Sequence, residues 1–230
     1  MRRNRCLICH TPLVETLSFA TLFQKEETNI CRKCKHALIK IREHKCKRCS
    51  KPCKDDVCSD CLLFERQMKR KRTHNTSLYV YNDKMKEIIA NWKFRGDAVL
   101  VDVFREELQT LYRKKWKGFT VVPIPLHEKR LAERGFNQAM QLARLMTEEV
   151  TPLLIRTDET EGRSKWTKKE RMKQTAQFEV RDTIKLKSPI KQVLLIDDIY
   201  TTGTTIENAY EALKHIQTIE TIQAITLARG

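Results

Sequence analysis

The sequence predicts an α/β fold, with a parallel sheet flanked by helices, preceded by a small cysteine-rich metal-binding module. Residues 193–205 combine a short apolar run with two carboxylates and a turn of hydroxyls and glycine, and a helical pattern follows. Such a run is typical of a strand buried on both faces of a parallel sheet. All nine cysteines lie within residues 6–61. We therefore expect a zinc-ribbon-like module over residues 1–65, a basic linker over 66–77 and an α/β domain over 78–230.

Eight of the nine cysteines form Cys-x-x-Cys pairs, which in a cytosolic protein indicate metal binding more than disulfides. Two such pairs about 20 residues apart suit one tetrahedral zinc site. This spacing predicts two sites, although an interleaved pairing stays open, and Cys53 is left over as a free thiol or an alternative ligand. The predicted ligands are Cys6, Cys9, Cys31 and Cys34 in one site and Cys46, Cys49, Cys58 and Cys61 in the other.

Closed sites of four cysteines are structural, because no position stays open for a substrate. A module this short has too little core to fold alone, so bound metal would supply the folding free energy. We therefore expect chelation to unfold residues 1–65 while the second domain stays folded. His10 and His36 lie beside pairs that already hold two thiolates, and we expect neither to be a ligand.

Positive charge is concentrated in the first third of the chain. The net charge is formally +16, and residues 1–74 carry 19 Lys and Arg against 8 Asp and Glu. A run of cations, Arg66–Arg72, lies near the end of this part. Such a surface gains affinity for phosphate backbones by counterion release, so we expect contact with nucleic acid. The alternative is a solvated basic face that keeps a small module soluble.

No apolar run approaches the roughly 18 residues of a membrane span. Residues 1–5 lead straight to Cys6 without the apolar stretch of a signal peptide. We expect a cytoplasmic protein without membrane insertion, which partners could bring to the inner face of the membrane.

Along the chain, residues 77–81 predict a strand, residues 84–94 a helix, and Asp97 the N-cap of a second helix that runs to about Lys115. Gly118 ends that helix, and residues 119–122 predict the next strand. Two prolines then hold a turn that carries Lys129, Arg130 and Arg134, and a helix follows from Ala139. Turns of this kind at the carboxyl edge of a sheet hold ligands in open α/β folds, and the basic charge suits pyrophosphate. Exposed surface cations are the alternative.

The remaining segments are shorter or less regular. Residues 153–156 and 177–180 predict strands, as do residues 221–227 near the end of the chain. The highly charged residues 157–176 predict a mobile loop, which could close over an anionic ligand and exclude water. A surface insertion without a role in binding is the alternative.

The stretch 193–205 has the parts of a phosphate and ribose site. A glycine turn at a helix N-terminus binds a phosphate monoester, and the neighbouring hydroxyls donate to it. Adjacent carboxylates at a strand's carboxyl end accept from a vicinal diol, directly or through Mg²⁺. A buried strand that ends in a polar turn would be the plainer interpretation. The whole run, Val-Leu-Leu-Ile-Asp-Asp-Ile-Tyr-Thr-Thr-Gly-Thr-Thr, resembles the PRPP-binding motif of type I phosphoribosyltransferases.

Together with the cysteine pairs, the stretches Lys93-Phe-Arg-Gly-Asp97, Val122-Pro-Ile-Pro-Leu126 and Arg134-Gly-Phe-Asn-Gln-Ala139 extend the resemblance over nearly the whole chain. This combination resembles the ComF family of competence proteins, and its ComFC branch closely. The resemblance implies a type I phosphoribosyltransferase fold behind a zinc-ribbon module, and a role in DNA uptake during natural transformation. It also implies a ComFA-type DNA translocase as partner. The charged loop departs from the family pattern at Arg163, Trp166 and Gln174.

The resemblance also implies roles for single residues, with structural zinc and with Mg²⁺ accompanying PRPP. Asp197 and Asp198 would hold the ribose hydroxyls and be the catalytic carboxylates. Arg130, Arg134 and Lys93 would bind the pyrophosphate. The 5-phosphate would be held by Thr201, Thr202, Gly203, Thr204 and Thr205.

Whether phosphoribosyl transfer occurs, and to which acceptor, stays open. One alternative is an active phosphoribosyltransferase of nucleotide metabolism, although little chain follows the motif to recognise a base. The other is a nucleic-acid-binding adaptor with a vestigial phosphate pocket.

Overall fold

A central sheet of four parallel strands organises the computed structural model, which describes residues 5–13, 29–95, 98–157, 178–181 and 189–230. In spatial order the strands are β1 (His74–Val80), β6 (Thr221–Arg229), β5 (Gln192–Tyr200) and β2 (Thr120–Pro123). A separate antiparallel pair consists of β3 (Leu154–Arg156) and β4 (Phe178–Val180). The predicted α/β class, with a parallel sheet flanked by helices, is confirmed.

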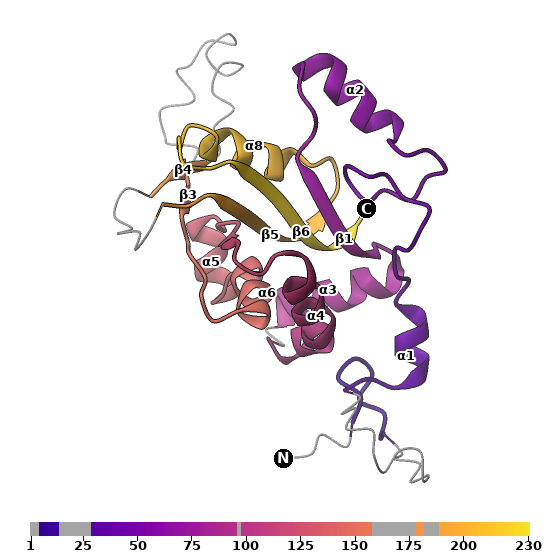
Figure 1. Cartoon of the computed structure of the whole chain (residues 1–230). Helices are drawn as coiled ribbons and strands as arrows, with labels where there is room; N and C mark the ends of the chain where they lie inside the picture. Colours follow the sequence, from indigo (N-terminus) through magenta and orange to yellow (C-terminus); the bar gives the residue numbers. More distant parts are fainter. Residues whose placement is uncertain (1–4, 14–28, 96–97, 158–177, 182–188) are drawn as a thin grey trace, which may run out of the picture.

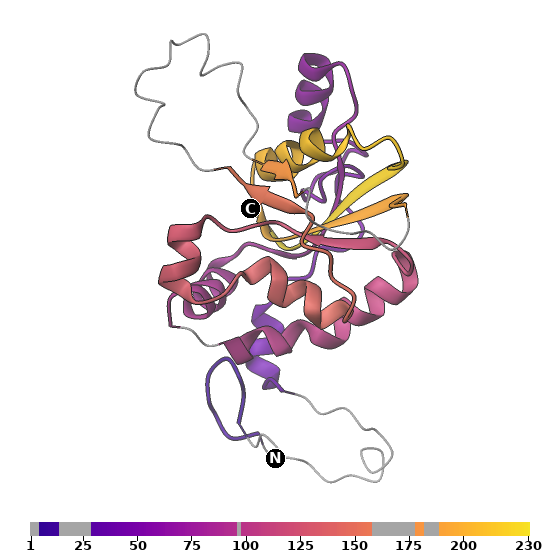
Figure 2. The same cartoon turned by 90° about the vertical axis from the view of Figure 1, so that its left-hand side faces the viewer.

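Helices cover both faces of this sheet, as Figure 2 shows with the sheet between the two layers. One face packs against α3 (Asp83–Arg95), the 3-10 helix η1 (Ala98–Phe104), α4 (Arg105–Lys115) and α6 (Gln138–Met146). The other packs against α8 (Thr204–Leu213), β3 and β4. Side chains alternate along β5, so Leu194 and Ile196 join the first core and Val193 and Leu195 the second. A strand buried on both faces explains the continuous apolar run in the sequence.

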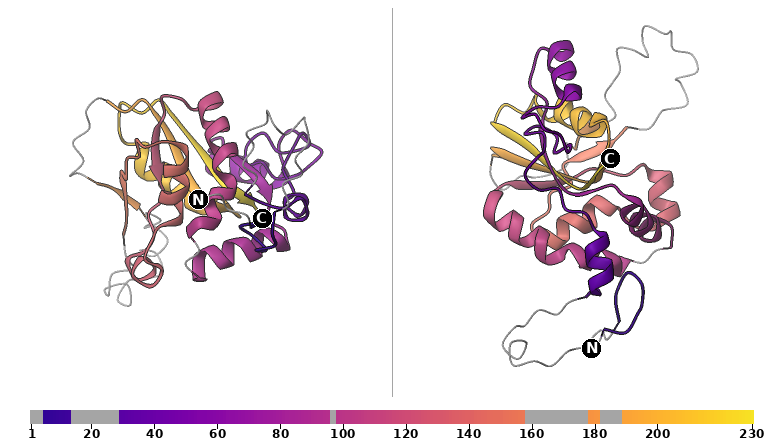
Figure 3. Two further views of the ribbon diagram at one scale, coloured as in Figure 1. Left: turned by 90° about the horizontal axis from the view of Figure 1, so that it is seen from below. Right: turned by 90° about the vertical axis from the view of Figure 1, so that its right-hand side faces the viewer.

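The cysteine-rich segment follows the free edge of β1, from α1 (Arg32–Ala37) at one end to α2 (Ser59–Met68) at the other (Figures 1 and 3). The backbone N–H of Val80 donates to the carbonyl of Ile39 at 2.8 Å, and that of Ile41 donates to Leu78 at 2.9 Å. Farther along the edge, the hydroxyl of Ser50 donates to Asn75. The segment thus satisfies backbone groups that an edge strand would otherwise expose.

Several elements extend beyond the ranges that the sequence predicts. Residues 66–68 complete α2 and residues 74–77 belong to β1, so only residues 69–73 of the expected linker connect the two. The turn expected after β2 contains a short helix, α5 (Glu128–Arg134), which ends at Gly135 with a φ of +74°. Asp97 and most of the charged loop, with its three family departures, lie outside the described residues.

The most important difference concerns β5, which was expected to end at Ile196. It continues to Tyr200, because residues 197–200 go on pairing with β6. The two carboxylates are therefore part of the strand and not of the turn that follows it. No helix in the described part of the chain is long and apolar enough to cross a membrane.

Candidate functional site

The structure brings together the eight cysteines in the two groups that the spacing predicts. In each group the four sulfur atoms lie within 4.8 Å of one another. The Sγ–Sγ distances include 3.7 Å between Cys9 and Cys31 and 3.8 Å between Cys46 and Cys61. Four sulfurs at about 2.3 Å from a tetrahedral Zn²⁺ would be roughly 3.8 Å apart. The geometry and the donor atoms are compatible with two structural zinc sites.

Both clusters have the same local architecture. Each begins with a tight turn, in which the residue after the second cysteine has a positive φ, His10 at +58° and Ser50 at +59°. Each is completed by a Cys-x-x-Cys pair at a helix N-terminus, where Cys31 and Cys58 are the N-cap residues of α1 and α2. The partial positive charge of a helix N-terminus stabilises thiolates. The chain therefore folds the same four-cysteine unit twice.

Hydrogen bonds favour the thiolate form of one cysteine in each cluster. Contacts with the side chain and backbone of Thr11 lower the pKa of Cys9 to about 6. Burial raises the pKa of Cys46, but backbone hydrogen bonds, from Cys58 first, outweigh it and lower the pKa to about 7. Since the thiolate is the metal ligand, both shifts favour metal binding.

Three residues near the clusters are not part of them. Cys53 is half-buried, and its thiol donates to the carbonyl of Asp55 at 3.1 Å. His10 and His36 belong to neither group among the described residues. His10 and His36 stay predicted non-ligands, and Cys53, for which the sequence left a free thiol or an alternative ligand open, lies outside both groups.

The second cluster, Cys46, Cys49, Cys58 and Cys61, lies against the sheet, and its cysteines share a core with β5 and α8. Arg229, at the end of β6, is only 4% exposed. Its guanidinium donates to the Tyr200 carbonyl at 3.2 Å and to the Cys49 sulfur at 3.8 Å, and it stacks over the Tyr200 ring. No carboxylate pairs with Arg229 among the described residues. A buried cation needs a compensating anion, and a zinc–tetrathiolate centre, with a net charge of about −2, would supply it.

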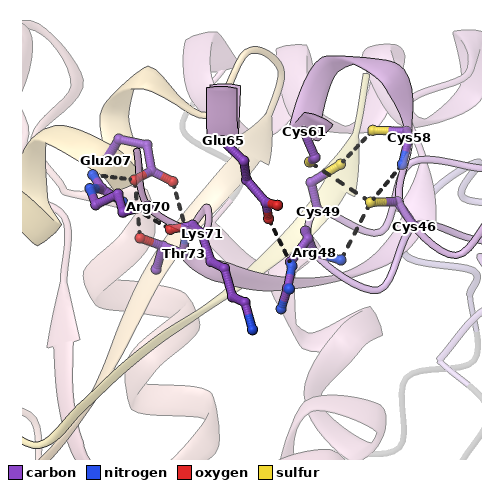
Figure 4. A network of polar contacts seen from close by, with 10 residues as sticks. All are labelled: Cys46, Arg48, Cys49, Cys58, Cys61, Glu65, Arg70, Lys71, Thr73 and Glu207. Carbon is purple, nitrogen blue, oxygen red and sulfur yellow. Dashed lines mark hydrogen bonds and ion pairs between the residues drawn. The ribbon is translucent and has the colours of Figure 1, made fainter. Parts of the chain in front are cut away.

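A second connection joins the cysteine-rich segment to α8 (Figure 4). Glu207, in the first turn of α8, is buried and accepts from both the backbone N–H and the hydroxyl of Thr73. Its carboxylate also pairs with Arg70 at 2.8 Å, and Arg70 pairs with Glu211 at the same distance. Arg70 and Thr73 lie in the connection between α2 and β1, so this network fixes the start of α8 to that connection.

The chain connectivity predicts a crevice at the carboxyl ends of β2 and β5. The connection after β2 leads to α6 on one face of the sheet, whereas β5 leads directly to α8 on the other. Neighbouring parallel strands whose connections diverge in this way leave a crevice where α/β proteins bind ligands. The predicted PRPP-binding stretch occupies the β5 side of that crevice.

Two carboxylates and one lysine meet at this end of β5. Asp198 is 9% exposed and forms an ion pair with Lys93 of α3. Burial, and then the negative charge of Asp198, raise the pKa of Asp197 well above its ordinary value. Two adjacent carboxylates form a donor set suited to a divalent cation or a diol.

The turn after β5 is built around Gly203, which is the N-cap residue of α8 and has a φ of +84°. A Cβ at this position would lie 2.2 Å from the hydroxyl oxygen of Tyr200. The side chains of Thr201, Thr202 and Thr204 are exposed, and the hydroxyls of Thr202 and Thr204 lie 2.9 Å apart. A helix N-terminus with exposed hydroxyls beside it suits a phosphate group.

Among the predicted pyrophosphate ligands, only Lys93 is paired with the carboxylates of β5. Arg134 ends α5, donates to the side chain of Gln138 at 3.2 Å and lies over the ring of Phe94, 5.4 Å from its centroid. Arg130 is exposed on α5. This stacking places Arg134 beside the end of α3, the helix that carries Lys93.

The sequence analysis did not identify Arg229 and Glu207. Arg229 contacts the last residue of β5, and Glu207 fixes the first turn of α8 to Thr73. A lone arginine ending the apolar run of β6 was a usable signal, because a charge there needs a buried partner. Glu207 gave no comparable signal, since an acidic residue in a first helical turn is common.

Comparison with known proteins gives two close relatives. The chain is 34% identical to the competence protein ComFC of Bacillus subtilis (strain 168) over 231 residues, 98% of this chain and 95% of that protein. It is 32% identical to the competence protein ComFC of Streptococcus pneumoniae (strain ATCC BAA-255 / R6) over 212 residues, 91% of this chain and 93% of that protein. No protein-family model matches the chain.

Proposed function

The chain belongs to the ComFC family of competence proteins, and from that premise we propose that it binds PRPP with Mg²⁺ while acting on single-stranded DNA during natural transformation. Its role in competence follows from the family. The ligand, the cation and the DNA are our proposal, which rests on the crevice at the carboxyl end of β5.

One observation carries the proposal for PRPP. The Lys93–Asp198 ion pair and the glycine turn before α8 adjoin the same end of one central strand. A ligand with a phosphate at one end and a ribose diol at the other suits this spacing. We assign the 5-phosphate to residues 201–205, the ribose hydroxyls and Mg²⁺ to Asp197 and Asp198, and the pyrophosphate to Lys93, Arg130 and Arg134.

Arg130 is the weakest of these assignments, because it is exposed and contacts none of the other ligands in the described part of the chain. Lys93 has the strongest support. Its pairing with Asp198 keeps a cation at the point where the carboxylates and the pyrophosphate would meet. Bound Mg²⁺ would replace the Lys93 ammonium group beside the Asp198 carboxylate.

We also propose that both cysteine clusters bind structural zinc. The compensating cation Arg229 supports this for the second cluster, and the shared architecture supports it for the first. The contacts of Arg229 with Cys49 and with Tyr200 would then tie zinc binding to the shape of residues 201–205, which we call the phosphate turn.

An adaptor role in nucleic-acid binding is the second candidate, and the net charge of +16 favours it. The two roles are compatible. A ComFA-type translocase would be the partner that brings such an adaptor to the membrane.

Replacing both carboxylates tests the PRPP assignment. We expect Asp197→Asn with Asp198→Asn to weaken binding of Mg²⁺–PRPP roughly a hundredfold or more, since two charge-assisted interactions of about 1.5–3 kcal/mol each are lost. Calorimetric titration measures the change. Asp83→Asn is the matched control, because Asp83 is an exposed acid in α3 that pairs only with a surface lysine. Normal binding by a folded, zinc-loaded double variant would show the assignment to be wrong.

A further inference from the structure

A groove with a volume of about 700 Å³ lies between the cysteine-rich segment and α4. Residues of β1 such as Leu78 and Tyr79 form its base. Its walls come from the chain after α1, including Leu38 and Ile41, and from η1 and α4. Figure 1 shows the elements that border it, α1, β1 and α4. None of the residues assigned to PRPP lines this groove.

Positive charge predominates around the groove. Three acidic residues line it, and two of them are already paired, Asp102 with Arg105 at 2.6 Å and Glu107 with Lys40 at 3.1 Å. Five other cations line it for which no ion pair is found in the described part of the chain. They are Lys35 from α1, Arg42 and Lys45 from the chain after α1, and Lys114 and Lys115 from the last turn of α4.

Like charges meet in this groove. Lys45, in the chain after α1, and Lys115, at the end of α4, both line it. Neither has an ion-pair partner in the described part of the chain, so cations from two segments repel one another across the groove. An anion bound between them would relieve the repulsion.

We propose that this groove binds the phosphate backbone of single-stranded DNA, with Lys45 and Lys115 among the cations that contact phosphates. The inference rests on the proposed role in DNA uptake and names the surface that would serve it. Aliphatic side chains line the groove beside the cations, among them Leu38, Ile41 and Leu111. The unpaired bases of single-stranded DNA can lie on such a surface, whereas the bases of duplex DNA stay stacked inside the double helix.

The basic run at residues 66–72 is the competing surface, and the structure uses part of it elsewhere. Arg70 pairs with Glu207 and Glu211, and Arg72 lies over the ring of Phe64, 4.4 Å from its centroid. Lys69 and Lys71 are exposed. These two lysines provide a control pair that matches Lys45 and Lys115 in charge.

Salt-dependent binding of a fluorescent oligothymidylate to the zinc-loaded full chain tests the inference. We expect Lys45→Gln with Lys115→Gln to lower affinity about tenfold near physiological salt, and to reduce the slope of log K against log salt by about 1.4, the loss of two phosphate contacts. Lys69→Gln with Lys71→Gln should leave both quantities close to those of the unchanged protein.

The outcomes separate the inference from its premise. An unchanged slope in the groove variant, with normal binding by the unchanged protein, would overturn the inference and favour an acidic protein as the occupant. A larger effect in the control pair would also overturn it and return DNA to the basic run. Absence of oligothymidylate binding by the unchanged protein would instead overturn the proposed role in handling DNA.

Discussion

Replacing Cys49 by serine is expected to remove one of two bound zinc ions and, with it, most of the affinity for PRPP. Cys49 contacts Arg229, which in turn donates to the carbonyl of Tyr200, the last residue of β5. Without the thiolate charge Arg229 would be a buried cation with no anion, a change that costs about 3–5 kcal/mol. We expect the chain at the end of β5 to shift, and PRPP affinity to fall at least about tenfold.

Two other cysteines give matched comparisons. Cys9→Ser should also remove one zinc ion but leave PRPP binding intact, because the first cluster, unlike the second, shares no core with α8 and has no contact with Arg229 in the described part of the chain. Cys53→Ser should retain both ions, since Cys53 belongs to neither cluster. Zinc content by mass spectrometry and PRPP affinity by calorimetry measure both effects. Zinc loss without any change in PRPP affinity in Cys49→Ser would refute the connection through Arg229.

This result would revise an expectation that the sequence alone suggests. The spacing of the cysteines predicts a module that unfolds on chelation while the second domain is unaffected. The second cluster instead shares a core with β5 and α8. Chelation should therefore disturb the phosphate turn as well as the cysteine-rich segment.

The second large effect is expected from Gly203→Ala. The backbone at this position has a φ of +84°, which costs an L-residue about 1–2 kcal/mol. The new Cβ would also lie 2.2 Å from the hydroxyl oxygen of Tyr200. The Tyr200 ring is buried, so it has little room to move away. Because the turn must move to accommodate it, we expect PRPP affinity to fall about a hundredfold.

Gly118→Ala is the control for backbone strain. Gly118 has a φ of +93°, but no heavy atom lies within 4 Å of the position its Cβ would take. This variant should lose about 1 kcal/mol of stability and bind PRPP normally. Equal PRPP affinities in the two variants would contradict the role of Gly203 in shaping a phosphate site.

The parts of the fold that were predicted correctly depend on local pattern. The absence of any polar residue in the run 193–196 indicated a buried strand. The spacing of the cysteines indicated which of them form each cluster. Periodicity also located α3 and α6 to within a few residues.

The features that escaped prediction depend on contacts between distant residues. The sequence could not show that β5 continues through Asp198, because that depends on pairing with β6, near the end of the chain. It also could not show that Arg70 would pair with Glu207, 137 positions away, so the run 66–72 was interpreted as a solvent-facing basic surface. Tertiary pairing removed cations that composition alone counted as free.

PRPP binding is the central claim, and titration calorimetry of Mg²⁺–PRPP into the zinc-loaded full chain tests it most directly. The account predicts saturable binding of one PRPP per chain that depends on Mg²⁺. Heats at the level of dilution, from protein that is folded and holds its zinc, would contradict it and leave the adaptor role as the function that the chain supports.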